Sequence, residues 1–106
     1  MAGDPALMVE KVAVCTGSGS SLLGNFFDSG AQAYISGDLR YHDARAIEAA
    51  DLGMVDIGHF ASEYLVVEDL ALRLQKTLST QGIQIAVEAS RLEKDPFRSF
   101  AIISFL

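Results

Sequence analysis

Short apolar runs and helical stretches alternate along the chain, with glycines between them. Four runs have the short, apolar, β-branched character of strands, and they cover residues 11–15, 33–35, 54–57 and 84–89. Between these runs, apolar residues recur at helical spacing in the stretches 22–27, 41–51 and 60–81. Gly30, Gly53 and Gly82 follow these stretches, at positions where glycine commonly ends a helix. The pattern predicts three strand–helix units followed by a fourth strand.

This alternation predicts a single α/β domain over residues 1–106. Strand–helix–strand units favour a mainly parallel sheet with right-handed crossovers. Strands that are continuous apolar runs are typical of sheets whose two faces are both covered by helices. We therefore predict a three-layer fold around a mainly parallel sheet of about four or five strands. The longest helix is expected to turn one apolar stripe toward the core, formed by Leu65, Val66, Leu70, Leu74 and Leu78.

The C-terminal segment, FRSFAIISFL, carries one charged residue, Arg98. An exposed apolar segment of this kind promotes association unless something covers it. It is predicted to be either an edge strand or a segment that packs against a partner.

The charge balance argues against some classes of binding partner. The chain has 14 acidic and 8 basic residues and a net charge of −6, which argues against a broad basic surface for nucleic acid or anionic membranes. No uncharged apolar run approaches the roughly 20 residues of a membrane helix, and the N-terminal residues MAGDPAL do not resemble a signal peptide. The lone cysteine, Cys15, cannot form an internal disulfide, which fits a reducing compartment. We expect a cytoplasmic protein.

The candidate binding and catalytic residues lie in three loops that follow the predicted parallel strands. Ligands in open α/β sheets bind at the carboxyl ends of the strands, so residues 16–21, 36–43 and 56–63 should meet there. His59 and Glu63 are four residues apart where a helix begins, which places both on one helix face. Imidazole and carboxylate at this spacing can chelate Zn²⁺ or Fe²⁺. The alternative is a carboxylate favoured by the helix N-terminus beside a histidine that only forms hydrogen bonds.

Two further loops carry weaker signals. His42 could act as a general acid or base oriented by Asp43, or it could sit solvated on a helix that Asp38 caps. The loop TGSGSS (16–21) could cradle an anion or nucleotide through its backbone N–H groups, or it could simply line the cleft. Cys15, on an apolar strand, is interpreted as a structural thiol.

Four sequence blocks occur together in a familiar order. They are VAVCTGSGSSLL (12–23), GAQAYISGDLRYHDA (30–44), GMVDIGHFASE (53–63) and DPF (95–97). Over residues 10–97 the chain resembles the C-terminal half of the Nif-three-like family, whose members are often labelled GTP cyclohydrolase type 2 homologues. The resemblance implies two related α/β halves with two metal ions between them, commonly in hexameric rings.

The resemblance also implies roles for individual residues. A histidine and a glutamate of the GHxxxE block bind metal in the family, and they correspond to His59 and Glu63. The histidine of the YHDA block, here His42, lies near the family's site as a possible catalytic residue. The family's remaining ligands come from an N-terminal half with a His-His-Pro motif, which this chain lacks.

Three hypotheses follow. The first is one half of a metal-dependent hydrolase that acts on a nucleotide-like or phosphate substrate, with zinc or iron bound in the complete protein. The second is a non-catalytic assembly module, and the third is an anion- or nucleotide-binding domain. In the first case this chain alone is expected to be inactive and to hold its metal weakly.

Overall fold

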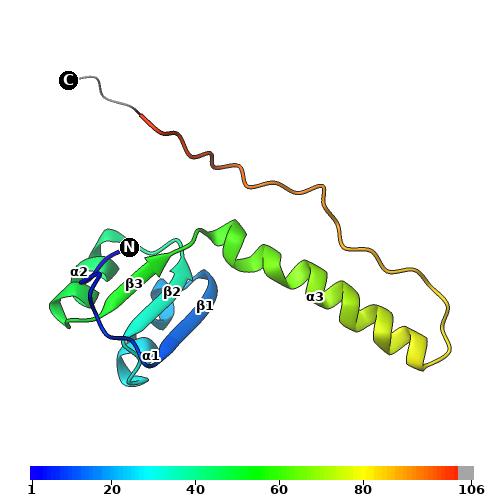
Figure 1. Ribbon diagram of the computed structural model, residues 1–106, viewed down its shortest axis with the longest axis horizontal. Coiled ribbons are helices and arrows are strands. Elements are labelled where there is room, and N and C mark those ends of the chain that lie inside the picture. Colours follow the sequence, from blue (N-terminus) through cyan, green and yellow to red (C-terminus); the bar gives the residue numbers. More distant parts are fainter. Residues whose placement is uncertain (103–106) are drawn as a thin grey trace.

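A computed structural model describes residues 1–102 of the chain and shows a small sheet from which one long helix projects (Figure 1). The elements in chain order are β1 (Val12–Ser18), the 3₁₀ helix η1 (Ser20–Leu22), α1 (Leu23–Asp28), β2 (Ala33–Gly37), α2 (Tyr41–Ala49), β3 (Gly53–Asp56) and α3 (His59–Thr80). The predicted α/β alternation is confirmed for the first three strand–helix units.

The three strands form one parallel sheet in the order β1-β2-β3. Tyr34 of β2 is in register with Ala13 of β1 on one side and with Met54 of β3 on the other. Parallel strands need crossover connections, and the helices α1 and α2 supply them. All three strands therefore end at the same edge of the sheet.

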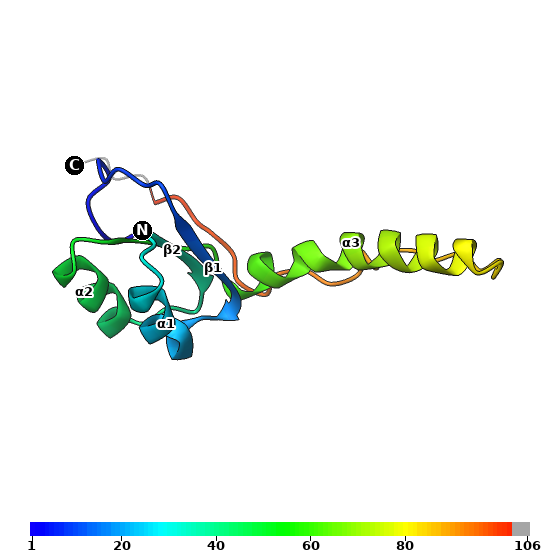
Figure 2. The same ribbon diagram turned by 90° about the horizontal axis from the view of Figure 1, so that it is seen from below.

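Both crossover helices lie on the same face of this sheet (Figure 2). The strand order advances in one direction from β1 to β3, and two right-handed crossovers in the same direction place their helices on one face. On the opposite face, Val12 and Val14 of β1 are 46% and 67% exposed. The predicted third layer is therefore not seen within residues 1–102.

The core lies between the sheet and these two helices. Phe26 of α1 stacks on Tyr34 of β2 with ring centroids 5.0 Å apart, and both side chains are buried. Ile47 of α2 and Met54 of β3 complete the cluster together with Ala31. Few large side chains share this core, so each contributes much of the stability.

Helix α3 departs from the predicted packing. Leu65, Val66, Leu70 and Leu74 were expected to face the core, but their side chains are exposed in the structure. The helix leaves the sheet after its first turn, and 22 residues at ~1.5 Å each carry its far end about 33 Å away. Leu78, the fifth residue of the predicted stripe, is half-buried. The other half-buried positions beyond the first turn of α3 are Tyr64, Val67, Ala71 and Gln75.

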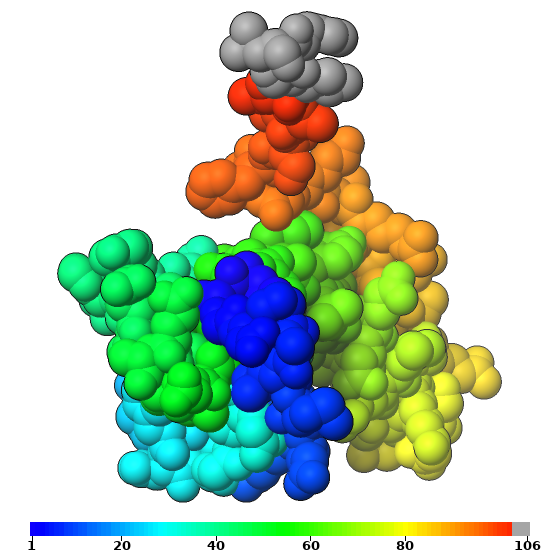
Figure 3. Space-filling view, turned by 60° about the vertical axis from the view of Figure 1, so that its left-hand side comes forward, coloured from blue at the N-terminus to red at the C-terminus, as the bar shows by residue number. Residues whose placement is uncertain are grey.

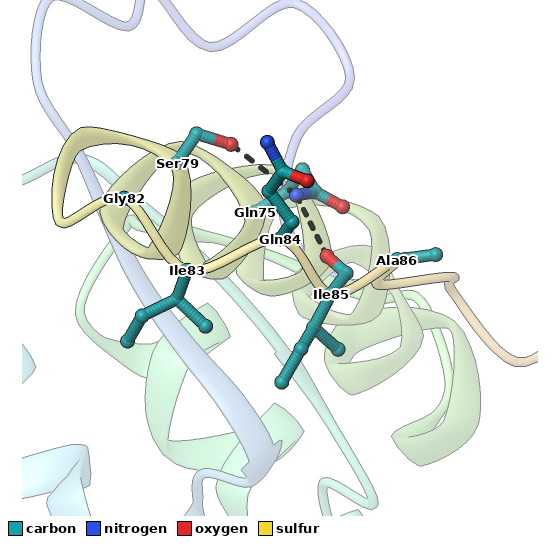
Figure 4. A pocket seen from close by; sticks show the side chains of 7 residues that line it. All are labelled: Gln75, Ser79, Gly82, Ile83, Gln84, Ile85 and Ala86. Carbon is teal, nitrogen blue, oxygen red and sulfur yellow. Dashed lines mark hydrogen bonds between the residues drawn. The ribbon is translucent and has the colours of Figure 1, made fainter.

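The predicted fourth strand at 84–89 is wrong, because the chain turns at Gly82 and runs back along α3 without joining the sheet. The Gln75 side chain donates to the carbonyl oxygen of Ile85 (3.0 Å) and accepts from the backbone N–H of Val87 (2.8 Å). The first of these contacts is visible in Figure 4, in a hollow at the end of α3. Gln75 thus satisfies backbone groups that a neighbouring strand would have used.

Residues 98–102 project away from the rest of the molecule (Figure 3). Phe97, Phe100 and Ile102 are each more than four-fifths exposed. The predicted edge strand is not formed by residues 97–102, and residues 103–106 of the same prediction lie outside the described part of the chain. Within residues 1–102, no helix is both long enough and apolar enough to cross a membrane.

Candidate metal-binding site

The loops after the three strands converge at one edge of the sheet, as predicted. Gly17, at the end of β1, lies so close to α3 that a Cβ atom there would sit 2.6 Å from Glu63 Oε1 and 3.3 Å from His59 Nε2. Its φ of +69° is also a backbone conformation that favours glycine. Glycine at this position leaves room for both side chains.

Asp56 joins the loops that follow β2 and β3. Its Oδ2 accepts a hydrogen bond from the backbone N–H of Leu39 (3.0 Å), and its Oδ1 accepts one from that of Gly58 (2.9 Å). These two backbone groups directly follow Asp38 and directly precede His59. The carboxylate of Asp56 therefore fixes the spacing between Asp38 and His59.

Ser62 joins the first turn of α3 to the end of β1. Its buried hydroxyl accepts from the backbone N–H of Gly17 (2.7 Å) and donates to the carbonyl oxygen of His59 (2.7 Å). The His59–Glu63 pair is thus built on a helix turn that is held against the sheet.

The imidazole of His59 lies between two carboxylates. Its Nδ1 is 2.6 Å from Asp38 Oδ2, and its Nε2 is 3.3 Å from Glu63 Oε1. The hydrogen bond with Asp38 is the main cause that raises the pKa of His59 above its ordinary value; partial desolvation opposes the shift, and the Glu63 carboxylate adds to it. A raised pKa means that this interaction stabilises the fold fully below the unfolded-state pKa and is lost as the pH rises through the folded-state pKa. The site therefore favours positive charge at the ring.

The geometry limits how many of these groups one ion can bind. Among residues 1–102, no group of three or more His, Cys, Asp or Glu side chains is arranged to hold a metal ion. The two nitrogens of an imidazole point in diverging directions, so Asp38 on Nδ1 and Glu63 beside Nε2 cannot share one ion with the ring. His59 Nε2 and Glu63 Oε1 remain as a two-donor set of the type that suits zinc or iron.

An apolar wall from the C-terminal segment completes a hollow at this site. Its lining consists of Asp38, Gly58, His59, Phe60, Glu63, Asp95, Pro96 and Phe97. The ring of Phe60 also stacks on Tyr64 one turn along α3, with centroids 5.0 Å apart. The sequence blocks around His59 and at 95–97 thus meet in space, although the residue pattern had given Phe60 and the DPF block no site role.

His42 does not line this hollow. It is exposed on the first turn of α2, edge-on to the ring of Tyr41 at 5.5 Å. Its predicted partner Asp43 is buried and accepts hydrogen bonds from Ser20 Oγ (2.5 Å) and the backbone N–H of Arg40 (2.8 Å). The carboxylate of Asp43 therefore organises the start of α2 and does not orient His42.

The pKa of Asp43 reflects this structural role. Burial opposes its ionisation, but the hydrogen bonds from Ser20 and Arg40 outweigh burial and lower the pKa of Asp43. Ionised Asp43 accordingly stabilises the fold above its unfolded-state pKa, and that contribution is lost as the pH falls through the folded-state pKa.

Two backbone N–H groups of the glycine-rich segment 16–21 are used in hydrogen bonds within the fold. The N–H of Gly17 bonds to Ser62, and the N–H of Gly19 bonds to the carbonyl oxygen of Gly37 (3.3 Å). These donors are not turned toward an anion, so the geometry does not favour the nucleotide-cradle hypothesis.

Cys15 is half-buried against the core, as expected of a structural thiol. The predicted cap at Asp38 is wrong, because its side chain bonds to His59.

Solved structures contain the same arrangement of elements. The crystal structure of Staphylococcus aureus protein SA1388 superposes with a TM-score of 0.85 and 30% identity, over 93% of this chain and 28% of that one. The crystal structure of a Bacillus cereus protein related to NIF3 superposes with a TM-score of 0.79 and 32% identity, over 87% of this chain and 25% of the other.

Sequence comparisons agree with these structures. The family described as Duf34/NIF3 (NGG1p interacting factor 3) matches residues 1–96. A Staphylococcus aureus GTP cyclohydrolase 1 type 2 homolog is 32% identical over 96 residues, which are 91% of this chain and 26% of that protein. A Mycobacterium tuberculosis protein with the same name is 45% identical over 64 residues, 59% of this chain and 17% of its own length. The chain thus spans about a quarter of the length of the Staphylococcus relative.

Proposed function

The chain belongs to the Duf34/NIF3 family, and we propose that it supplies His59 and Glu63 as two ligands of a divalent-metal centre in a hydrolase. The observation that carries this proposal is the pair of donors itself. His59 Nε2 and Glu63 Oε1 lie 3.3 Å apart on one helix turn and face an open hollow. Both side chains are about half exposed, so an ion can reach them.

The donor set fits zinc or iron, because a neutral imidazole and a carboxylate are ordinary ligands of both metals. When bound, such an ion lowers the pKa of a coordinated water toward neutrality and supplies a nucleophile. In this chain, His59 and Glu63 would bind the ion, and neighbouring residues would line the site. Phe60, Pro96 and Phe97 would contribute apolar surface to one side of the hollow.

Further ligands would come from outside residues 1–102. Two protein donors fall short of the three or four that hold zinc in catalytic and structural sites. The open side of the hollow and the short span of the chain against its relatives support a second lobe or another subunit as their source. We propose that this domain works in such an assembly, including a homo-oligomeric ring, and that alone it binds metal weakly.

The substrate class is proposed from the names of the relatives. The Staphylococcus and Mycobacterium proteins are called GTP cyclohydrolase 1 type 2 homologs, which favours a nucleotide-like or phosphate-bearing substrate. His42 stays a predicted acid–base residue for that reaction. It would act on a substrate that extends from the hollow toward the first turn of α2.

Zinc titration of the chain, followed by NMR of its two histidine rings, tests the metal-binding proposal. We expect Zn²⁺ to shift the imidazole resonances of His59, because Nε2 becomes a ligand. His59→Ala and Glu63→Gln should each weaken binding, because each removes one of the two proposed donors. His42→Ala is the matched control and should bind Zn²⁺ as the unmodified chain does. Equal shifts at His42 and His59, or binding that survives both site substitutions, would contradict the proposal.

A second candidate function is a non-catalytic assembly module. The uncovered sheet face at Val12 and Val14 and the exposed apolar tail favour it. The zinc titration separates the two, since an assembly module without a metal role would leave the ring of His59 unshifted.

A further inference from the structure

We propose that Asp38 is a positioning residue that holds the neutral ring of His59 with its proton on Nδ1 and its Nε2 lone pair free for a metal ion. This inference rests on the proposed function and adds a role that the donor pair alone does not give. The distance that carries it is the 2.6 Å between His59 Nδ1 and Asp38 Oδ2.

The assignment of the proton follows from what each group can do. An ionised carboxylate has only acceptor sites, whereas a neutral imidazole has one N–H donor and one acceptor nitrogen. At 2.6 Å, the nitrogen that faces Asp38 must carry the hydrogen, because two facing lone pairs would repel each other.

Glu63 competes for the same proton from the other side of the ring. Its Oε1 is also an acceptor, but it lies 3.3 Å from Nε2, beyond the range of a strong charge-assisted hydrogen bond. The shorter contact decides the competition in favour of Asp38. When the proton is on Nδ1, Nε2 has a free lone pair and lies 3.3 Å from Glu63 Oε1, which is also an acceptor. A cation bound to both atoms would relieve the repulsion between them.

The backbone around Asp38 is built to keep this contact. Asp38 has a φ of 47°, in the left-handed region that non-glycine residues seldom adopt. The Asp56 carboxylate accepts hydrogen bonds from the next backbone N–H, that of Leu39, and from the backbone N–H of Gly58. These two bonds connect the loop that contains Asp38 to the start of α3. The residue before Asp38, Gly37, packs against the backbone of Gly58 and His59 with no room for a Cβ.

The same pattern orients histidine ligands in metal sites generally. A ligand histidine usually donates its second ring N–H to a carboxylate or carbonyl, which fixes the ring and its tautomer. Asp38 makes that contact here, which assigns it an orienting role and leaves direct coordination to His59 and Glu63.

Asp38→Asn tests the inference, because an asparagine keeps the shape and tolerates the left-handed backbone but can also turn its NH₂ group toward Nδ1. The ¹⁵N shifts of the His59 ring are recorded without metal, about two to three pH units above the usual histidine pKa of about 6.5. We expect the proton on Nδ1 in the unmodified chain and a shift of the tautomer population toward Nε2–H in the variant. Zn²⁺ affinity should fall about 10- to 100-fold in the variant.

Asp51→Asn is the matched control, since Asp51 is the other aspartate with a positive φ (55°) and lies outside the hollow. It should change neither the tautomer nor zinc affinity. A proton on Nε2 in the unmodified chain would overturn the role of Asp38. So would an unchanged tautomer and zinc affinity in Asp38→Ala, whose side chain has no acceptor for the Nδ1 proton. That result differs from failure of the proposed function, in which Zn²⁺ leaves the His59 ring of the unmodified chain unshifted.

Discussion

Replacing Phe26 with alanine is expected to lower the free energy of unfolding by about 3–5 kcal/mol. Phe26 is 2% exposed and stacks on Tyr34, so the substitution removes a large side chain from the centre of a five-residue core. The cavity would lie between α1 and β2, beside the ring of Tyr34. Urea denaturation followed by circular dichroism measures the change.

Phe27 provides the control within the same helix. Its side chain is 38% exposed, and its ring lies beside that of Phe26 at a tilt of 40°. Phe27→Ala should cost about 1 kcal/mol or less. Equal losses for the two variants would mean that the core does not lie between the sheet and α1.

Replacing Gly37 with alanine is the second change with a large expected effect. A Cβ at this position would lie 2.8 Å from each of three backbone atoms, Gly17 O, Gly58 C and His59 N. Backbone atoms cannot rotate away as the end of a side chain can, so the end of β1 and the start of α3 must separate. We expect a loss of about 2–3 kcal/mol, at the upper end of what overpacking costs. The His59 ring resonances should also shift, because its contact with Asp38 depends on this spacing.

Gly24→Ala is the contrasting substitution. Gly24 lies in α1, and a Cβ there would meet nothing within 4 Å. Alanine should therefore raise the stability by about 0.4–1 kcal/mol, because it restricts the unfolded chain without a clash. Tolerance of Gly37→Ala would refute the close packing around the site, and destabilisation by Gly24→Ala would contradict the open space beside that residue in α1.

The parallel sheet could be predicted because its signals are local. The apolar runs of β1, β2 and β3 and the helix ends near Gly30 and Gly82 follow from short stretches of sequence. One helix end differs in detail. Helix α2 ends at Ala49, and the residue with the left-handed backbone is Asp51, ahead of the predicted stop at Gly53. Aspartate tolerates this conformation better than most residues with a side chain.

The fourth strand and the packing of α3 could not be predicted because they depend on distant contacts. Residues 84–89 have strand-like composition, but α3 carries them away from the sheet and Gln75 binds their backbone. The stripe of Leu65, Leu70 and Leu74 has the spacing of a buried face, yet that face is exposed in residues 1–102. Spacing predicts that a face is apolar, and it does not say which segment covers it.

For the candidate site, too, the local features could be predicted from the sequence and the long-range contacts could not. The spacing of His59 and Glu63 places them on one helix turn, and the structure bears this out. The partnership of Asp38 with His59 spans 21 residues and depends on the Asp56 bridge, so no local pattern contains it. The wall formed by Pro96 and Phe97 requires the chain to return along α3, which only the fold reveals.

The position of a bound ion tests the central claim most directly. Crystals of the chain grown with Zn²⁺ would be measured at the zinc absorption edge, and the anomalous difference map would locate the metal. We predict a peak about 2.0–2.2 Å from both His59 Nε2 and a carboxylate oxygen of Glu63, with Asp38 still on Nδ1. A peak on Nδ1 of His59, or zinc bound elsewhere with this pair empty, would contradict the account.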